Sequence, residues 1–134
     1  NYMFKAGLER IDPKRYIFYN HDEQGKIEAL KVLGRMGMRT KEFVDKDMNV
    51  PGFLTQLKAI KRWGKDPEDD LEYITQPTLI VNGDKDMQVP TENSYDMHKK
   101  IAGSKLKIYS KAGHGSIFQY AEEFSKELIA FLED

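Results

Sequence analysis

The sequence predicts an α/β fold, in which parallel strands alternate with helices. A continuous apolar run, residues 78–81, follows Pro77 and is typical of a strand buried on both faces of a parallel sheet. A second run with alternating polarity lies at residues 105–110, and a helical pattern follows each run. The order strand, helix, strand, helix indicates α/β architecture, with a right-handed crossover between the strands.

The first 76 residues are expected to be mainly helical. Apolar residues recur every three positions from Gly25 to Met36, and at intervals of four and three in residues 51–63. The aromatic run at residues 16–19 is a candidate short strand. The charged stretch at residues 64–70 contains a proline and is expected to be a connector. We place the boundary between two regions, 1–76 and 77–134, near Gln76.

In the second region, a helix is predicted from Thr91, as its cap, to about Ala102. The next strand, residues 105–110, is expected to have one face in solvent, with Tyr109 and two lysines on that face. A single helix is then expected over residues 117–132.

Composition excludes several classes of protein. At 134 residues the chain is long enough for one ordinary domain, and no apolar run reaches the length of a membrane helix. The 21 Lys and Arg residues nearly balance the 22 Asp and Glu residues, so neither nucleic acid nor a membrane surface is expected as a partner. The absence of cysteine excludes disulfides, thiolate zinc sites and a cysteine nucleophile. A cytoplasmic location is expected.

Two loops after the predicted strands carry residues suited to acid–base chemistry. Residues 83–86 follow the first strand, and residues 112–115, which include His114, follow the second. In open parallel sheets ligands bind beyond the carboxyl ends of the strands, and adjacent strands lie about 4.8 Å apart, so side chains of the two loops are expected to meet. A carboxylate bonded to one imidazole nitrogen leaves the other free to take a proton from a nucleophile. The glycines beside His114 are expected to permit a tight turn.

The loop acids and His114 also have simpler structural roles open to them. A loop carboxylate is more often a turn residue or a helix cap, and this applies equally to Asp84 and Asp86. An isolated histidine is more often solvated or packed in a core. The joint placement of an acid and a histidine after successive strands favours the catalytic interpretation.

No cofactor and no metal is expected. The stretch from Asp84 begins like a calcium-binding loop, but it has Val89 at the sixth position, where glycine is required, and Tyr95 at the twelfth, where glutamate is required. No glycine-rich loop opens a helix after a strand, so no nucleotide site is predicted. His98 is expected to be solvated. His21 lies in a polar loop, and no feature of the sequence supports a substrate contact for it.

These motifs resemble the C-terminal half of an α/β-hydrolase. In that family an apolar strand ends in Gly-x-x-Asp followed by Val-Pro, which Gly83, Asp86 and residues 89–90 match. The family's histidine loop is matched by residues 113–115. The resemblance is strong over residues 74–134 and loose over residues 20–65. It implies Asp86 as the acid and His114 as the base of a catalytic triad, and residues 1–76 as mainly a helical cap.

This sequence departs from the family's pattern at the nucleophile. The family's Gly-x-Ser-x-Gly motif, which precedes the acid in the chain, is missing here, because all five serines follow Asp86 (Ser94, Ser104, Ser110, Ser116 and Ser125). Ser116 is interpreted as the N-cap of the last helix. The chain is therefore expected to be an incomplete fold, a cap plus the last two strands of a longer protein, and to be inactive alone.

Two classes of function remain open. The first is a serine-type hydrolase that cleaves an ester, lactone, amide or related bond of a small molecule. The alternative is a non-catalytic interaction module that retains part of a hydrolase fold. In either case an unpaired strand edge or bare apolar helix face is expected to favour self-association.

Overall fold

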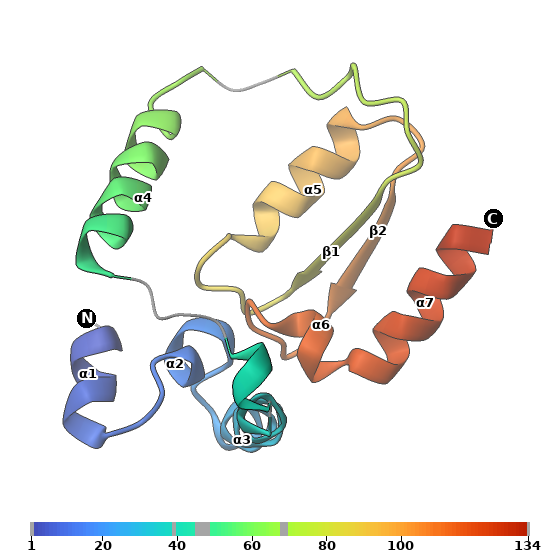
Figure 1. Ribbon diagram of the computed structural model, residues 1–134. Coiled ribbons are helices and arrows are strands. Elements are labelled where there is room, and N and C mark those ends of the chain that lie inside the picture. Colours follow the sequence, from blue (N-terminus) through green and yellow to red (C-terminus); the bar gives the residue numbers. More distant parts are fainter. Residues whose placement is uncertain (1, 39, 45–48, 68–69, 134) are drawn as a thin grey trace.

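The computed structural model describes residues 2–38, 40–44, 49–67 and 70–133. Its elements, in chain order, are α1 (Tyr2–Glu9), α2 (Lys14–Phe18), α3 (Glu23–Gly37), the 3-10 helix η1 (Lys41–Phe43), α4 (Val50–Trp63), β1 (Leu79–Gly83), α5 (Thr91–Lys100), β2 (Lys105–Tyr109), α6 (Ser116–Gln119) and α7 (Ala121–Glu133). The predicted order of strand, helix, strand, helix in the second region is confirmed (Figure 1).

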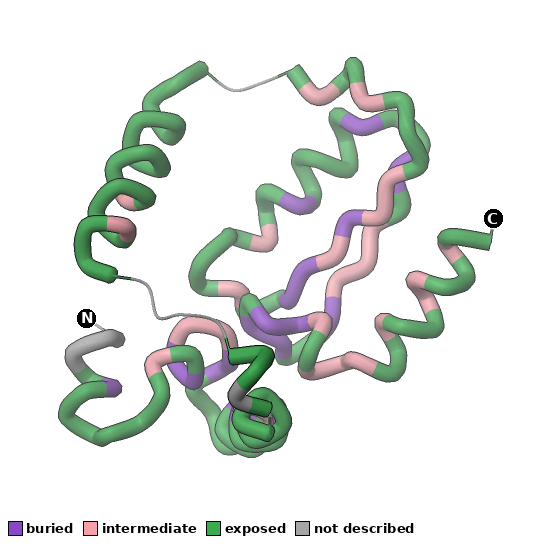
Figure 2. Tube along the Cα trace, viewed as in Figure 1, coloured by how far each residue is buried: buried purple, intermediate pink, exposed green. Residues whose placement is uncertain are grey.

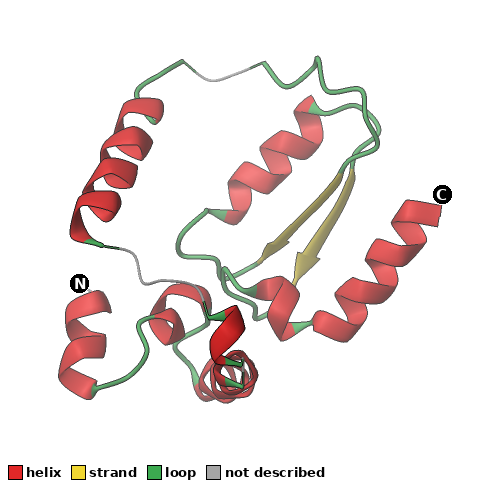
Figure 3. Cartoon of the chain, in the orientation of Figure 1, coloured by secondary structure: helices red, strands yellow, loops and turns green. Residues whose placement is uncertain are grey.

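In the described part of the chain, the sheet has two strands, β1 and β2. They pair in parallel, with Leu79 opposite Lys105 and Gly83 opposite Tyr109. Helix α5 packs on both strands, and α7 lies on the other side of the strands from α5 (Figure 3). Because the strands run in parallel without offset, both carboxyl ends and the loops that follow them lie at one edge of the sheet.

The face of β2 that was predicted to be in solvent is partly covered, so this prediction was wrong for Tyr109. That residue is only 2% exposed, its ring stacks on Tyr120, and its hydroxyl donates to Glu127 of α7. Lys107 on the same face pairs with Glu123 and Glu127. Burial, with Glu127 nearby, raises the pKa of Tyr109 to about 12, so its phenol stays a hydrogen-bond donor at neutral pH. Helix α7 is thus attached to the sheet by polar contacts.

The last helical stretch is divided in two, and its caps differ from the prediction. Tyr120 interrupts it, with φ −108° and ψ 37°, and its hydroxyl donates to Ser110 O at 2.7 Å. Ser116 is the first residue of α6 and not its cap. Thr91 is likewise the first residue of α5, and its hydroxyl donates to Gly83 O at 2.7 Å. The start of α5 is therefore fixed by a contact with the end of β1, and the break between α6 and α7 by a contact with Ser110.

The aromatic run at residues 16–19 is not a strand, because most of it lies in α2. The Asp12 side chain accepts the backbone N–H of Lys14 at 2.9 Å, and a helical turn follows Pro13. Tyr19 at the end of the run packs with Ala29 and Val32 of α3 in a small core. Helix α3 confirms the helix predicted near residues 25–36, and Asp22 caps it by accepting Gly25 N at 2.7 Å.

Helix α4 confirms the helix predicted over residues 51–63, with Asn49 as its cap. Most of its large apolar side chains are exposed, including Phe53, Ile60 and Trp63, and the tube of α4 in Figure 2 is almost entirely green. Part of the connector predicted at residues 64–70 lies outside the described residues. Within the described part of the chain, no helix combines the length and apolarity needed to cross a bilayer.

Candidate active site

The loops after β1 and β2 meet at the carboxyl edge of the sheet. We call residues 84–90 the acid loop and residues 110–115 the histidine loop. Backbone pairing continues from the strands into both loops, since Asp84 N donates to Tyr109 O at 3.0 Å and Lys85 N donates to Ala112 O at 2.9 Å. The two loops are thus held together by their backbones before any side chain is considered.

Gly83 makes this close approach of the loops feasible. A Cβ atom at this position would lie 2.6 Å from Gly113 O and closer still to Ala112 O. Both are backbone atoms, which cannot move aside without displacing the histidine loop. Gly83 has no positive φ, so the glycine is required for space rather than for backbone conformation.

Asp86 is held firmly by the turn in which it lies. Its Oδ1 accepts the backbone N–H groups of Gln88 at 2.8 Å and Val89 at 3.0 Å. The side chain is only 2% exposed. Bound in this way, the carboxyl group has its other oxygen, Oδ2, directed to a different partner.

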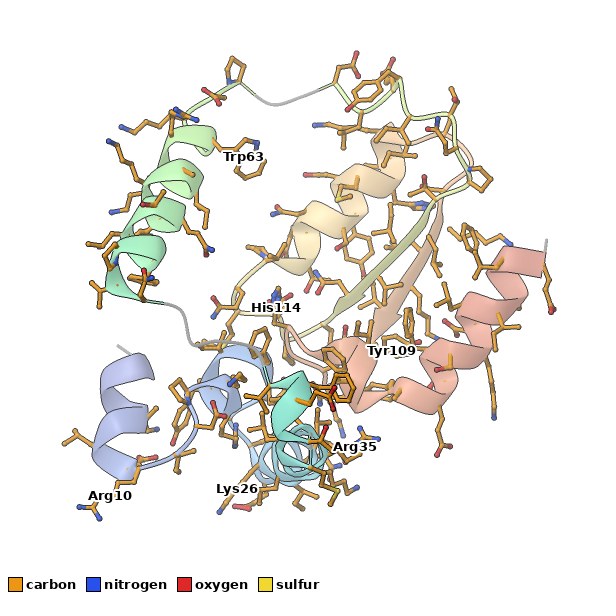
Figure 4. All side chains as sticks on the ribbon, in the orientation of Figure 1. Arg10, Lys26, Arg35, Trp63, Tyr109 and His114 are labelled. Carbon is orange, nitrogen blue, oxygen red and sulfur yellow. The ribbon has the colours of Figure 1, made fainter. Side chains whose placement is uncertain are left out.

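That partner is His114, which lies at the end of the sheet between α5 and α2 in Figure 4. The distance from His114 Nδ1 to Asp86 Oδ2 is 2.9 Å. A carboxylate only accepts, so Nδ1 carries the proton and Nε2 of the neutral ring has a free lone pair. The imidazole is 34% exposed, so a reactant can approach it. The predicted proximity of the two side chains is confirmed, while their catalytic role stays a prediction.

Asp84, the other acid considered in this loop, does not contact the histidine ring. Its Oδ1 accepts Ala112 N at 3.3 Å, and its Oδ2 accepts the Ser110 hydroxyl at 3.4 Å. Asp84 therefore links the two loops, whereas Asp86 alone of the two acids bonds to His114.

The glycines beside His114 serve a different purpose from the one predicted. Neither Gly113 nor Gly115 has a positive φ, so a tight left-handed turn does not explain them. A Cβ at Gly113 would lie 2.8 Å from Phe18 O, and one at Gly115 would lie 3.1 Å from the same atom. They make room for the backbone that follows α2. No sequence pattern signalled this contact, because the two segments lie about a hundred positions apart.

No serine hydroxyl forms a hydrogen bond with His114, and the structure describes all five serines. Four of the hydroxyls bond elsewhere: Ser94 to Asn82, Ser104 to His98, Ser110 to Asp84 and Ser125 to Ala121 O. Ser116, the one closest to His114 in sequence, is buried at the start of α6.

The other two histidines lie apart from the pair. His98 Nδ1 is 2.8 Å from the Ser104 hydroxyl, and His21 Nε2 is 3.0 Å from Tyr16 O. His98 therefore has a polar partner within the protein where solvent was expected. Among the described residues, no group of three or more His, Asp or Glu side chains is arranged to hold a metal ion.

A hollow of about 360 Å³ borders the acid loop. Residues 85–87 of the acid loop line it together with residues 20–22, which precede α3. The first region of the chain therefore contributes to the surroundings of the Asp86–His114 pair.

A parallel sheet with helices on both faces, whose carboxyl-end loops join a buried acid to an accessible histidine, defines this chain as part of an α/β-hydrolase fold. Comparison with known proteins agrees. The profile of the TAP-like protein family matches residues 55–134, and the chain belongs to this family of α/β hydrolases.

Two similar proteins are named as a peptidase and a hydrolase, and a similar solved structure is named as an alpha/beta hydrolase fold protein. A proline iminopeptidase of Saccharolobus solfataricus is 28% identical over 130 residues, which are 93% of this chain and 39% of that enzyme. A 2-hydroxy-6-oxononadienedioate/2-hydroxy-6-oxononatrienedioate hydrolase of Klebsiella pneumoniae is 33% identical over 84 residues, or 63% of this chain and 29% of the enzyme. The solved structure of an alpha/beta hydrolase fold protein from Chitinophaga pinensis superposes with a TM-score of 0.84 and 32% identity, covering 99% of this chain and 50% of that one. The chain spans half or less of the length of each of these proteins.

Proposed function

We propose that this chain is the acid–base part of a longer serine-type hydrolase, in which Asp86 orients His114 and a serine from outside these 134 residues is the nucleophile. The observation that carries the proposal is the 2.9 Å bond between His114 Nδ1 and Asp86 Oδ2, with Asp86 buried and the imidazole accessible. The absence of a serine bonded to His114 supports an external nucleophile.

In the proposed mechanism, Asp86 holds the His114 ring so that Nε2 faces the reactants without a proton. Nε2 takes the proton of the attacking serine hydroxyl and later returns it to the leaving group. Asp86 stabilises the imidazolium that forms between these steps and is itself held by the N–H groups of Gln88 and Val89.

The substrate class follows from this chemistry. Attack by an activated serine suits carbonyl compounds such as esters, lactones and amides. The names of the relatives include a peptidase and a hydrolase of dienedioates, which fits a carbonyl substrate without selecting one of these bonds. We propose a small molecule as the substrate, and residues 1–76 as a cap over the site, because residues 20–22 line the hollow beside Asp86.

The alternative function is a non-catalytic interaction module. The exposed apolar side chains of α4, such as Phe53 and Trp63, are the observation that favours it. It does not account for the Asp86–His114 pair, since a scaffold requires no acid that orients an accessible imidazole.

Labelling with a fluorophosphonate, a reagent for activated serines, tests the proposal on the full-length protein that contains this chain. We expect one adduct by mass spectrometry, on a serine outside these 134 residues, and a labelling rate that falls steeply in His114→Gln but not in His98→Gln. No adduct on the folded protein would favour the interaction module. An adduct formed at the same rate in His114→Gln would refute the role of His114.

A further inference from the structure

The segment Phe18–Asn20 begins at the last residue of α2, lies across the histidine loop and contacts it on both sides of His114. Gly115 N donates to Phe18 O at 2.6 Å, just after the histidine. The Asn20 side-chain amide donates to Lys111 O, three residues before it. These bonds join residues nearly a hundred positions apart in sequence and connect the first region of the chain to the loop that carries the imidazole.

The Phe18 ring itself stacks on the imidazole. The two ring centroids are 5.4 Å apart, and the ring planes are inclined by 23°. Phe18 is half-buried and packs against the core of Tyr19, Ala29 and Val32, so its ring is held by its own neighbours. A fixed aromatic ring on one face of the imidazole restricts its rotation and shields that face from water.

The remaining features of the loop agree with this arrangement. A Cβ atom added at Gly113 or Gly115 would lie within 3.1 Å of Phe18 O, so a side chain at either position would crowd this segment. Lys111 adopts a left-handed conformation, with φ 52°, which is uncommon for a residue with a side chain. Its carbonyl is held there by the amide of Asn20, which is itself buried. The histidine loop is therefore shaped around the Phe18–Asn20 segment.

We infer that Phe18 is a positioning residue for His114, which holds the imidazole in the orientation where Nδ1 meets Asp86. Asp86 fixes one edge of the ring and Phe18 covers one face, so together they leave Nε2 directed away from both. This inference rests on the proposed function for its effect on catalysis. It also means that a displacement of residues 18–20 is transmitted to the catalytic base.

The test compares two replacements of Phe18 in the full-length protein. Phe18→Leu removes the ring but keeps an apolar side chain, and Phe18→Tyr keeps the ring. A ring stacking contact of ordinary strength corresponds to a change of about three- to tenfold in rate. We expect kcat for an aryl ester to fall by about that factor in Phe18→Leu with KM nearly unchanged, and to stay within twofold of wild type in Phe18→Tyr.

A second readout does not depend on activity or on the folding of a variant. In the wild-type protein, proton NMR should show the carbon-bound ring protons of His114 shifted upfield by the Phe18 ring, relative to those of His98. His98 is the control because its ring contact is a serine hydroxyl.

Each outcome decides one proposal. An unchanged kcat in folded Phe18→Leu, or a rise in KM alone, overturns the positioning role, and so does the absence of the upfield shift in wild type. If His114→Ala retains full activity, it is the proposed function that fails. The NMR shift then still decides whether Phe18 holds the imidazole.

Discussion

Replacing His114 with alanine is expected to lower kcat for ester hydrolysis by about four to six powers of ten in the full-length protein, as removal of a triad base does. Without the imidazole, no group bonded to Asp86 can take the proton of the nucleophile. KM should change little, because the ring acts on the reacting proton and not on the bound substrate. Turnover of 4-nitrophenyl acetate by the purified variant measures this effect.

The control for this experiment is His98→Gln. His98 lies in α5, and its ring bonds to the Ser104 hydroxyl and not to the Asp86–His114 pair, so its loss should leave kcat within about twofold of wild type. Equal activity in His114→Ala and wild type would remove His114 from the mechanism. Circular dichroism of both variants shows whether the fold is retained.

Replacing Asp86 with asparagine is expected to lower kcat by about three to four powers of ten. Asparagine has nearly the same shape, and its Oδ1 can still accept the N–H groups of Gln88 and Val89, so the turn should survive. Its amide would donate toward His114 Nδ1, which forces the ring proton onto Nε2 and blocks that nitrogen as a base. Steady-state kinetics and thermal unfolding, measured together, distinguish the effect of the wrong histidine tautomer from a loss of stability.

Asp84→Asn is the matched control, since it makes the same chemical change two residues away in the same loop. Asp84 bonds to Ala112 N and to the Ser110 hydroxyl, and not to the imidazole. We expect kcat to stay within about threefold of wild type. If the two variants lost activity equally, the loss would reflect damage to the loops and not the specific role of Asp86.

The sequence predicted the part of the site that depends on local patterns. The apolar run at β1 and the alternating run at β2 marked two strands, and the parallel pairing of these strands brings Asp86 to His114. The helices α3 and α4 followed from their periodicity and from the residues at their ends. In each case the signal lies within about fifteen consecutive residues.

The parts that were missed depend on contacts between distant segments. Tyr109 is buried because Tyr120 and α7 cover it, which no alternation within β2 reveals. The purpose of Gly113 and Gly115, and the stacking of Phe18 on His114, arise from a segment near the other end of the chain. The aromatic run at residues 16–19 has the composition of a strand, but the turn that begins at Asp12 and Pro13 makes most of it helical.

The central claim is that Asp86 fixes the proton of His114 on Nδ1 and leaves Nε2 as the base. Nitrogen-15 NMR of the histidine ring, at a pH where the ring is neutral, measures this directly in the full-length protein. The account predicts a protonated Nδ1 and an unprotonated Nε2 for His114 in wild type, with the reverse in Asp86→Asn. A wild-type His114 that carries its proton on Nε2 would contradict it.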